Sequence, residues 1–477
     1  MTKAPDEIQV EYERLLQTAI DKTGIPREEL IRLINREFKD GELPRFMKLA
    51  NIPFAEHLVE EIKAEVKRSF EGLRSDLRER VNDTFRIILY NLVKCSLTRE
   101  RLSLPSSKGA YEGDSHYKKM HFTRRSVEAC LKALKPYLTK KTGNTYKHKV
   151  NSYAPNELFQ LRLIPLIYLV YEEYSEDTEL IIIQDKRNKE NDKIIYTKKQ
   201  LENYNNRNNK NSEPLKGVVE DNYRDNNNKH IMRVRSSIEL ERTYVEDLEQ
   251  LIKINDALKD ATYALKAPIK RIYSRGTVMH GGRLYTPLAN LPDRRARIRI
   301  NTLFNGNPVA EVDLKANHSS MLYAGLGKQL PKDFYQQIAN ASGVSRDKVK
   351  WLVMKMIGAK DRSISLTPDI DEQNFYKSKF LMTHAERRLI EDVITRLFPD
   401  LYAEFYQDRG VWMQAMEGDI LLDAMCDLID RGILSLPIHD ALYVEKQNIA
   451  EAEKALKASW KKNLNVDFEP FVDVDFP

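Results

Sequence analysis

Two short apolar stretches of this 477-residue chain each carry an aspartate where a strand would end. Residues 309–314 predict one strand that reaches Asp313, and residues 436–444 predict two strand halves on either side of His439-Asp440. Short runs rich in Val, Ile and Leu are typical of buried strands. If the strands lie side by side in one sheet, the two aspartates meet, and this pairing constrains the fold more than any other feature.

Paired carboxylates of this kind can hold divalent metal ions. Mg²⁺ prefers carboxylate oxygens and keeps several waters. Two such ions support nucleotidyl transfer, in which one activates a 3′-hydroxyl and the other clamps a triphosphate. An aspartate at a strand end is more often a cap or turn residue, so neither Asp313 nor Asp440 indicates a metal site by itself.

A helix predicted between these stretches carries two cations on one face. Ser345 is a suitable N-cap, and Arg346 and Lys350 stand four residues apart, so their side chains lie next to each other. Together with the helix dipole they present positive charge to a phosphate-sized target. An exposed basic stripe is the common alternative.

Four segments follow one another in an order that is more informative than any one of them. They are Gly282-Arg283-Leu284 with Asn290-Leu291, Glu311-Val312-Asp313, Arg346-x-x-x-Lys350 and Ile438-His439-Asp440. In this order they resemble the Gly-Arg-Leu segment and motifs A, B and C of the family A polymerases, which include bacterial repair polymerases and single-subunit phage enzymes. Residues 416–425 are similar to the palm helix before motif C. The resemblance covers residues 275–450, less than half of the chain.

The resemblance implies a role for each matching residue. Asp313 and Asp440 are the expected ligands of Mg²⁺, with Mn²⁺ as a substitute, and the carbonyl of Leu314 is expected to complete a coordination sphere. Arg346 and Lys350 are expected to bind the incoming triphosphate, and Lys350 to protonate the pyrophosphate leaving group.

Other matching positions are expected to contact substrates. Arg283 corresponds to a residue that contacts the minor groove near the primer end, and His439 to one beside the primer terminus. His318 and Met354 stand at nucleotide-binding positions. In the DNA enzymes the position of His318 usually holds a Glu that helps to exclude the ribose 2′-hydroxyl, and that of Met354 an aromatic residue that packs on the new base pair.

Further departures concern the ends of two motifs. Ile357-Gly358 replaces the usual Tyr-Gly at the end of the fingers helix, and Pro437 and Ala441 replace a Gln and a Glu around motif C. These changes leave sugar preference open without touching the metal and phosphate residues. The phrases 436–440 and 318–323 fit a smaller group better, the short family A-like proteins of phages, plasmids and integrated elements that carry an N-terminal winged-helix-like region.

Basic residues are concentrated ahead of these motifs. The net charge is +6, and residues 117–149 hold ten Lys or Arg against one acid, Glu128. A second group precedes Asp313 and consists of Arg294, Arg295, Arg297 and Arg299. A basic run is more often a solvated surface, but two runs beside recognisable motifs favour a nucleic-acid partner.

Residues 97–155 predict a basic DNA-binding module. Apolar residues at helical spacing predict an amphipathic helix over 121–134, followed by a strand at 137–145 and a return strand at 146–153. A helix followed by a basic hairpin resembles the winged helix-turn-helix, whose recognition helix enters the major groove. A generic basic hairpin is the alternative. The expected nucleic-acid contacts are Arg124, Arg125, Lys140 and Lys141.

Residues 156–267 predict a connecting region. Strands are expected at 179–184 and 193–196, and a long helix at 238–263. Residues 203–229 are rich in Asn and nearly free of apolar side chains, which is typical of an insertion that does not fold alone.

Four regions of an α+β protein therefore follow: a helical region at 1–96, the winged-helix-like module at 97–155, the connecting region at 156–267, and palm and fingers at 268–477. A helix at 449–463 and an edge strand at 468–474 are expected to complete the palm. The leading function is template-directed DNA synthesis. The expected partners are a DNA template-primer, nucleoside triphosphates and replication proteins.

Two other functions remain open, an RNA polymerase or primase on the same palm and a non-catalytic DNA-binding replication protein. No apolar run approaches the roughly 18 residues of a membrane span, and the charged N-terminus lacks a signal core. A cytoplasmic, intracellular protein with reduced thiols is expected, because Cys95, Cys130 and Cys426 have neither disulfide-framework nor zinc-ligand spacing.

Overall fold

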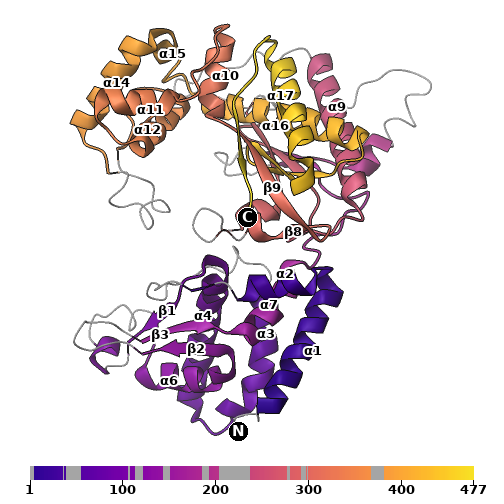
Figure 1. The fold of residues 1–477 in the computed structure, drawn as a ribbon, viewed down its shortest axis with the longest axis vertical. Helices are drawn as coiled ribbons and strands as arrows, with labels where there is room; N and C mark the ends of the chain where they lie inside the picture. The colour runs from indigo at the N-terminus through magenta and orange to yellow at the C-terminus, as the bar shows by residue number, and fades with distance from the viewer. Residues whose placement is uncertain are drawn as a thin grey trace.

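The computed structural model of the protein mixes helices and strands, which confirms the α+β class (Figure 1). Three predictions fall outside the described residues: the Asn-rich insertion at 203–229, the start of the return strand, and the pair Arg294 and Arg295. The described residues are 5–35, 37–38, 55–105, 108–112, 122–142, 151–184, 193–202, 237–276, 280–291, 297, 299–366 and 381–477.

The N-terminal part, indigo to purple in Figure 1, packs helices on a small antiparallel sheet. Its helices are α1 (Pro5–Thr23), α2 (Arg27–Ile34), α3 (Ala55–Val66), α4 (Ser75–Thr98), α6 (Arg124–Ala133) and α7 (Glu157–Ile167). Its strands, in the order β1-β3-β2, are β1 (Leu102–Leu104), β2 (Leu138–Lys141) and β3 (Asn151–Pro155). The return strand β3 extends beyond the predicted 146–153, because Leu138 takes Pro155 as its partner.

A buried arginine connects these helices. Arg162 of α7 is 8% exposed and forms ion pairs with Glu11 of α1 at 3.1 Å and with Glu61 and Glu65 of α3 at 2.7 and 2.5 Å. A guanidinium removed from water needs several acceptors for its five donors. Arg162 therefore holds α7, which comes from the predicted connecting region, against the N-terminal helices.

Two sheets form the centre of the C-terminal part. The first, in the order β5-β4-β6-β7, contains β4 (Ile181–Gln184), β5 (Lys193–Tyr196), β6 (Lys270–Tyr273) and β7 (Gly281–Tyr285). The second is antiparallel and runs β10-β11-β9-β12, with β8 beside β9. Its strands are β8 (Leu303–Phe304), β9 (Asn307–Leu314), β10 (Ser435–Ile438), β11 (Ala441–Glu445) and β12 (Val472–Asp475). Each strand predicted in this part is present, although several ends differ.

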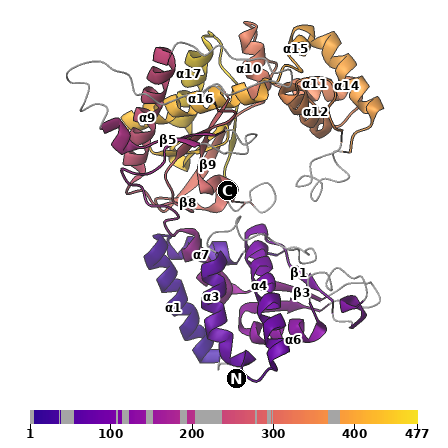
Figure 2. The same cartoon turned by 180° about the vertical axis from the view of Figure 1, so that it is seen from behind.

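Helices cover these sheets and build a lobe beside them. The long helix α16 (Gly410–Asp430) packs on β7 and against α9 (Ser237–Leu258) and α17 (Ile449–Leu464), and α17 contacts β9 and β11. α10 (Asn317–Gly325) follows β9 directly. The lobe lies to one side of the sheets in both views (Figures 1 and 2). It consists of α11 (Phe334–Ser342), α12 (Arg346–Gly358), α14 (His384–Leu397) and α15 (Pro399–Ala403).

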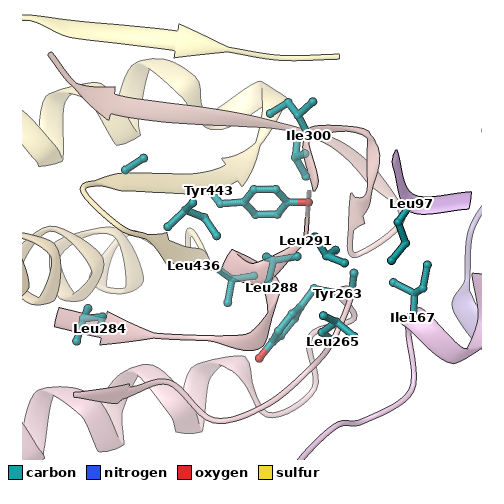
Figure 3. Close-up of a cluster of buried hydrophobic side chains, with 14 of the residues drawn as sticks. Leu97, Ile167, Tyr263, Leu265, Leu284, Leu288, Leu291, Ile300, Leu436 and Tyr443 are labelled. Atoms are coloured by element: carbon teal, nitrogen blue, oxygen red, sulfur yellow. The ribbon is translucent and has the colours of Figure 1, made fainter. Parts of the chain in front are cut away.

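One buried core runs through the junction of the two parts. Figure 3 shows Leu97 and Ile167, from the N-terminal helices, beside Leu265 and Tyr263 of the C-terminal part. The amide of Leu265 donates to the carbonyl of Ile167 at 2.6 Å. The four-region division of the chain stays a prediction, and within its third region α7 packs on α1 whereas β4 pairs with β6.

The structure also bears on the three cysteines and on membrane-spanning helices. Cys95 and Cys130 are buried free thiols, and Cys426 is a partly exposed one. Among the helices of the described residues, none is both long and apolar enough to cross a membrane.

Candidate active site

The second sheet places the two predicted aspartates on neighbouring strands. Asp313 lies near the end of β9 and pairs in register with Ala441 at the start of β11. His439 and Asp440 form the two-residue turn between β10 and β11, and the amide of Leu314 donates to the carbonyl of Asp440 at 3.4 Å. His439 adopts φ +58°, the left-handed conformation that tight hairpin turns require, and its side chain is exposed.

The electrostatics of this pair are unfavourable for two bare carboxylates. Burial, and then the charge of Asp440, raise the pKa of Asp313. Burial, and then the charge of Glu417, raise the pKa of Asp440. No Lys, Arg or His among the described residues forms an ion pair with either carboxylate.

A hard divalent cation fits this pair of oxygen donors, because its charge offsets their repulsion. Leu314, whose carbonyl was predicted as a further ligand, is the last residue of β9. Among the described residues, no group of three or more acidic, His or Cys side chains is arranged so that it could hold a metal ion. Two carboxylates are therefore the acidic donors that the site offers.

Helix α12 presents its predicted phosphate-binding face to solvent. Arg346, Lys350 and Met354 follow at intervals of four residues and are all exposed, whereas Val349 and Leu352 are buried. The positive charge of Lys350 lowers the pKa of Asp313, against the larger raising effect of burial, so Lys350 lies within electrostatic reach of Asp313. Ser345 stands at the N-cap position as predicted, but its side chain makes no capping hydrogen bond.

The guanidinium of Arg346 lies 5.9 Å from the centre of the Tyr335 ring of α11. Burial chiefly raises the pKa of Tyr335, the charge of Asp440 raises it further, and that of Arg346 lowers it. The start of α12 therefore shares the neighbourhood of Asp440.

Glu417 of α16, which no sequence argument singled out, joins two of the predicted residues. It is 2% exposed. Nε of Arg283 donates to its Oε2 at 2.8 Å, and Nε2 of His318 lies 2.7 Å from its Oε1. His318 is only 6% exposed, so this predicted nucleotide contact lies buried against an acid. Glu417 lies inside the stretch that resembles the palm helix, and this was its signal in the sequence.

Close backbone approach explains why Arg283 stands where it does. Gly282 has φ +74°, and a Cβ there would lie 2.5 Å from the ring of Tyr273. A Cβ on Gly418 of α16 would lie 2.1 Å from the carbonyl oxygen of Gly282. Only glycine fits both positions. The Gly282-Arg283 and Glu417-Gly418 pairs therefore bring their charged members together.

One further acid next to Asp313 was also missed. Asp473 of the edge strand β12 is the register partner of Asp313 on the side opposite to β11, and its charge contributes to raising the pKa of Asp313. Its Oδ1 accepts from Nζ of Lys315 at 3.0 Å. The sequence predicted this edge strand but not that Asp473 would stand opposite Asp313, because the register depends on the partner strand.

Two arginines of the second basic group form ion pairs within the protein. Arg299 makes a bidentate ion pair with Glu311 at 2.6 and 3.0 Å, and Arg297 binds the carboxylate of Asp475. Part of the positive charge of this group is therefore compensated by acids of the fold. A nucleic-acid partner for the group stays a prediction.

The first basic group stays on the surface within its described part. Arg124 and Arg125 of α6, and Lys140 and Lys141 of β2, are all exposed. Arg124 also pairs with Glu128 at 2.7 Å. The helix is held at its start by a capping box between Thr123 and Ser126. These four residues lie in the N-terminal part, on different elements from the Asp313 site.

The comparisons with known proteins add little. No protein-family model matches the chain, and no curated protein matches it. Among solved structures, it is similar to the POL domain of Pol1 from M. smegmatis in complex with DNA primer-template and dNTP, at 15% identity and a TM-score of 0.31. The match covers 49% of this chain and 51% of that one, so the chain spans about half of that chain's length. A TM-score this low does not support a conclusion about function, which is inferred from the residues of the site instead.

Proposed function

We propose that this protein is a template-directed DNA polymerase that works by two-metal nucleotidyl transfer. The observation that carries the proposal is the antiparallel pairing of β9 with β11, which brings Asp313 and Asp440 together close to Lys350. Two neighbouring carboxylates that form no ion pair with any described residue, beside a basic helix face, are what metal-bound triphosphate chemistry needs.

Each residue of the site has a distinct task in this proposal. Asp313 and Asp440, with the carbonyl of Leu314, would hold Mg²⁺, or Mn²⁺ in its place. Bound Mg²⁺ lowers the pKa of the primer hydroxyl and neutralises phosphate charge. Lys350 and Arg346 bind the triphosphate, and Lys350 donates a proton to the departing pyrophosphate.

The nucleic acid would be held by residues in both parts of the chain. Arg283 and His439 flank Asp440 and are proposed to contact the primer end. The order α4, β1, α6, β2, β3 with a basic hairpin supports a winged-helix-like module, in which Arg124, Arg125, Lys140 and Lys141 bind DNA. Such an enzyme would act in the cytoplasm with other replication proteins.

An RNA polymerase or primase is the second candidate function. The burial of His318 against Glu417 is the observation that favours this second candidate. Of the two predicted nucleotide contacts, His318 and Met354, Met354 is then the exposed one. Neither residue is a carboxylate gate against the ribose 2′-hydroxyl. A non-catalytic DNA-binding protein is the third candidate, and the electrostatic effect of Lys350 on Asp313, beside Asp440, argues against it.

Extension of a labelled primer on a DNA template in Mg²⁺, run separately with dNTPs and NTPs, tests the proposal. We expect dNTP-dependent extension by the wild type and none by Asp440→Asn. Preferential extension with NTPs would establish the second candidate. Tight DNA binding without a product from either set would contradict primed synthesis.

A further inference from the structure

Glu417 is the meeting point of three elements beside the aspartates. It belongs to α16, and it receives Nε of Arg283 from β7 at 2.8 Å and Nδ2 of Asn317 from α10 at 3.3 Å. Nε2 of His318, also on α10, lies 2.7 Å away. Burial alone would raise the pKa of Glu417, but His318 and Arg283 outweigh it and hold this pKa below its ordinary value. Glu417 is therefore a buried anion that depends on these two neighbours.

The same neighbours act on Asp440. After burial, the charge of Glu417 raises the pKa of Asp440, whereas the charges of His318 and Arg283 lower it. All three side chains therefore lie within electrostatic reach of a carboxylate that is proposed to bind metal.

The guanidinium group of Arg283 is only partly engaged in contacts within the described part of the protein. Among the described residues its hydrogen-bond partner is Glu417, which accepts from Nε, and the side chain is 27% exposed. Nearby, Arg271 is 1% exposed. Its Nε donates to the carbonyl of Gly282, its Nη2 donates to Ala415 and Asp419, and its Nη1 forms an ion pair with Asp247. A guanidinium has five donors in a rigid fork. The two Nη groups of Arg283 are therefore available to acceptors outside the protein.

We propose that Glu417 is a positioning residue, which fixes Arg283 by its Nε so that both Nη groups donate to acceptor atoms of the nucleic acid next to Asp440. This inference rests on the proposed polymerase function and deepens it. His318 and Asn317 hold the other carboxylate oxygen, so the anion itself does not rotate. A positive charge at residue 283 is then insufficient for this contact, because the two Nη groups of the guanidinium must also point toward the nucleic acid.

A double-mutant cycle tests the inference. Single-nucleotide addition is measured for the wild type, Arg283→Gln, Glu417→Gln and the double variant, each with its unfolding midpoint. Loss of a supporting partner behind a contact residue typically costs about 10- to 100-fold in activity. We expect such a loss in kcat/KM from either single change and no further loss in the double variant, because Glu417 acts through Arg283. Losses that multiply would overturn the proposal.

A binding measurement separates this inference from the proposed function. A primer with 2-aminopurine at its 3′ end reports the ordering of that base without nucleotide or metal. Glu417→Gln and Arg283→Gln should give the same fluorescence, distinct from that of the wild type. A wild-type signal from Glu417→Gln beside an altered one from Arg283→Gln would overturn the role of Glu417. If the wild type makes no product, the polymerase proposal fails while this readout still decides the inference.

Two more variants guard against a folding artefact. Asp423→Asn removes another hydrogen-bonded acid of α16, one that contacts Gln250, Lys462 and Asn463, and should leave the fluorescence unchanged. If Glu417→Gln does not fold, Arg283→Lys keeps the charge but loses the fork. It should behave like Arg283→Gln, and wild-type fluorescence and kcat/KM from Arg283→Lys would contradict the proposal.

Discussion

Two clusters of buried charge lie close together in the C-terminal part and are built on opposite principles. In the first, Arg271 of β6 is surrounded by acceptors, with Asp247 at 2.8 Å and Asp419 at 2.6 Å, and Tyr273 donates to Asp247 at 2.5 Å. In the second, Asp313 and Asp440 stand side by side and no described residue forms an ion pair with either. The charge of the first cluster is compensated by neighbouring side chains, and we call this cluster closed. The charges of the second are not compensated by an ion pair with any described residue, and we call this cluster open.

The two clusters differ in how they affect the stability of the fold. A buried arginine whose charge is compensated by two carboxylates costs little once folded, but removal of one member leaves an uncompensated charge. Burial raises the pKa of both aspartates, and the charge of Asp440 raises that of Asp313 further, so the ionised pair destabilises the fold unless a cation joins it. The second cluster therefore suits the metal binding that is proposed for it. The glycine contact between Gly282 and Gly418 holds the two clusters next to each other.

The largest effect is expected from Asp313→Asn. Synthesis should fall by at least about 1,000-fold, because the open cluster loses a metal ligand and its electrostatic stabilisation of the transition state. The unfolding midpoint should stay or rise, since a repulsive charge is removed. Rapid-quench kinetics and thermal unfolding measure the two. A variant that loses activity and stability together would show that Asp313 is structural.

Arg271→Met should produce the reverse pattern. The free energy of unfolding is expected to fall by about 3–5 kcal/mol, because Asp247 is left as an unpaired buried charge. Replacing both, as Arg271→Met with Asp247→Leu, should recover much of the loss, since Asp419 is partly exposed and can be hydrated. Denaturant unfolding measures both. Equal stability of the single variant and the wild type would remove the distinction between the clusters.

Two lysines of α12 provide a matched pair. Lys348 is bound to Glu386 at 2.6 Å, whereas Lys350 acts on Asp313. Lys350→Met should lower the rate of nucleotide addition by about 100-fold or more, as expected for loss of a proton donor and phosphate contact. Lys348→Met should leave it nearly unchanged. Similar rates for the two variants would mean that Lys350 is only part of an exposed basic stripe.

The smallest effect is expected on the basic hairpin. Lys140→Ala with Lys141→Ala should weaken DNA binding several-fold and make the slope of log K against log salt shallower by about 1.8, if each lysine contacts one phosphate. Lys198→Ala with Lys199→Ala is the control, because those lysines pair with Asp256 and Asp177. Fluorescence anisotropy across a salt series measures the slope, and an unchanged slope would remove these lysines from the DNA interface.

Sequence patterns predicted the local elements well where periodicity was strong. The strands that carry Asp313 and Asp440, the helix from Arg346 and the C-terminal helix α17 are all present. Ends were less accurate, as at β3, since the partner strand decides where pairing stops. The ion pairs of Arg297 and Arg299 could not be predicted, because Asp475 lies far away in sequence and Glu311 was considered only as part of a motif.

By itself the sequence determined where most of the strands and helices lie along the chain, although not their exact ends, because hydrophobic spacing and turn chemistry act over a few neighbours. It thereby placed two aspartates, a lysine and an arginine at element ends or on an exposed helix face. Tertiary structure alone decided which charges meet, since ion pairs form between residues far apart along the chain. That is why Glu417 emerged only in the fold, where Gly282 lets α16 approach β7 and brings its carboxylate to Arg283.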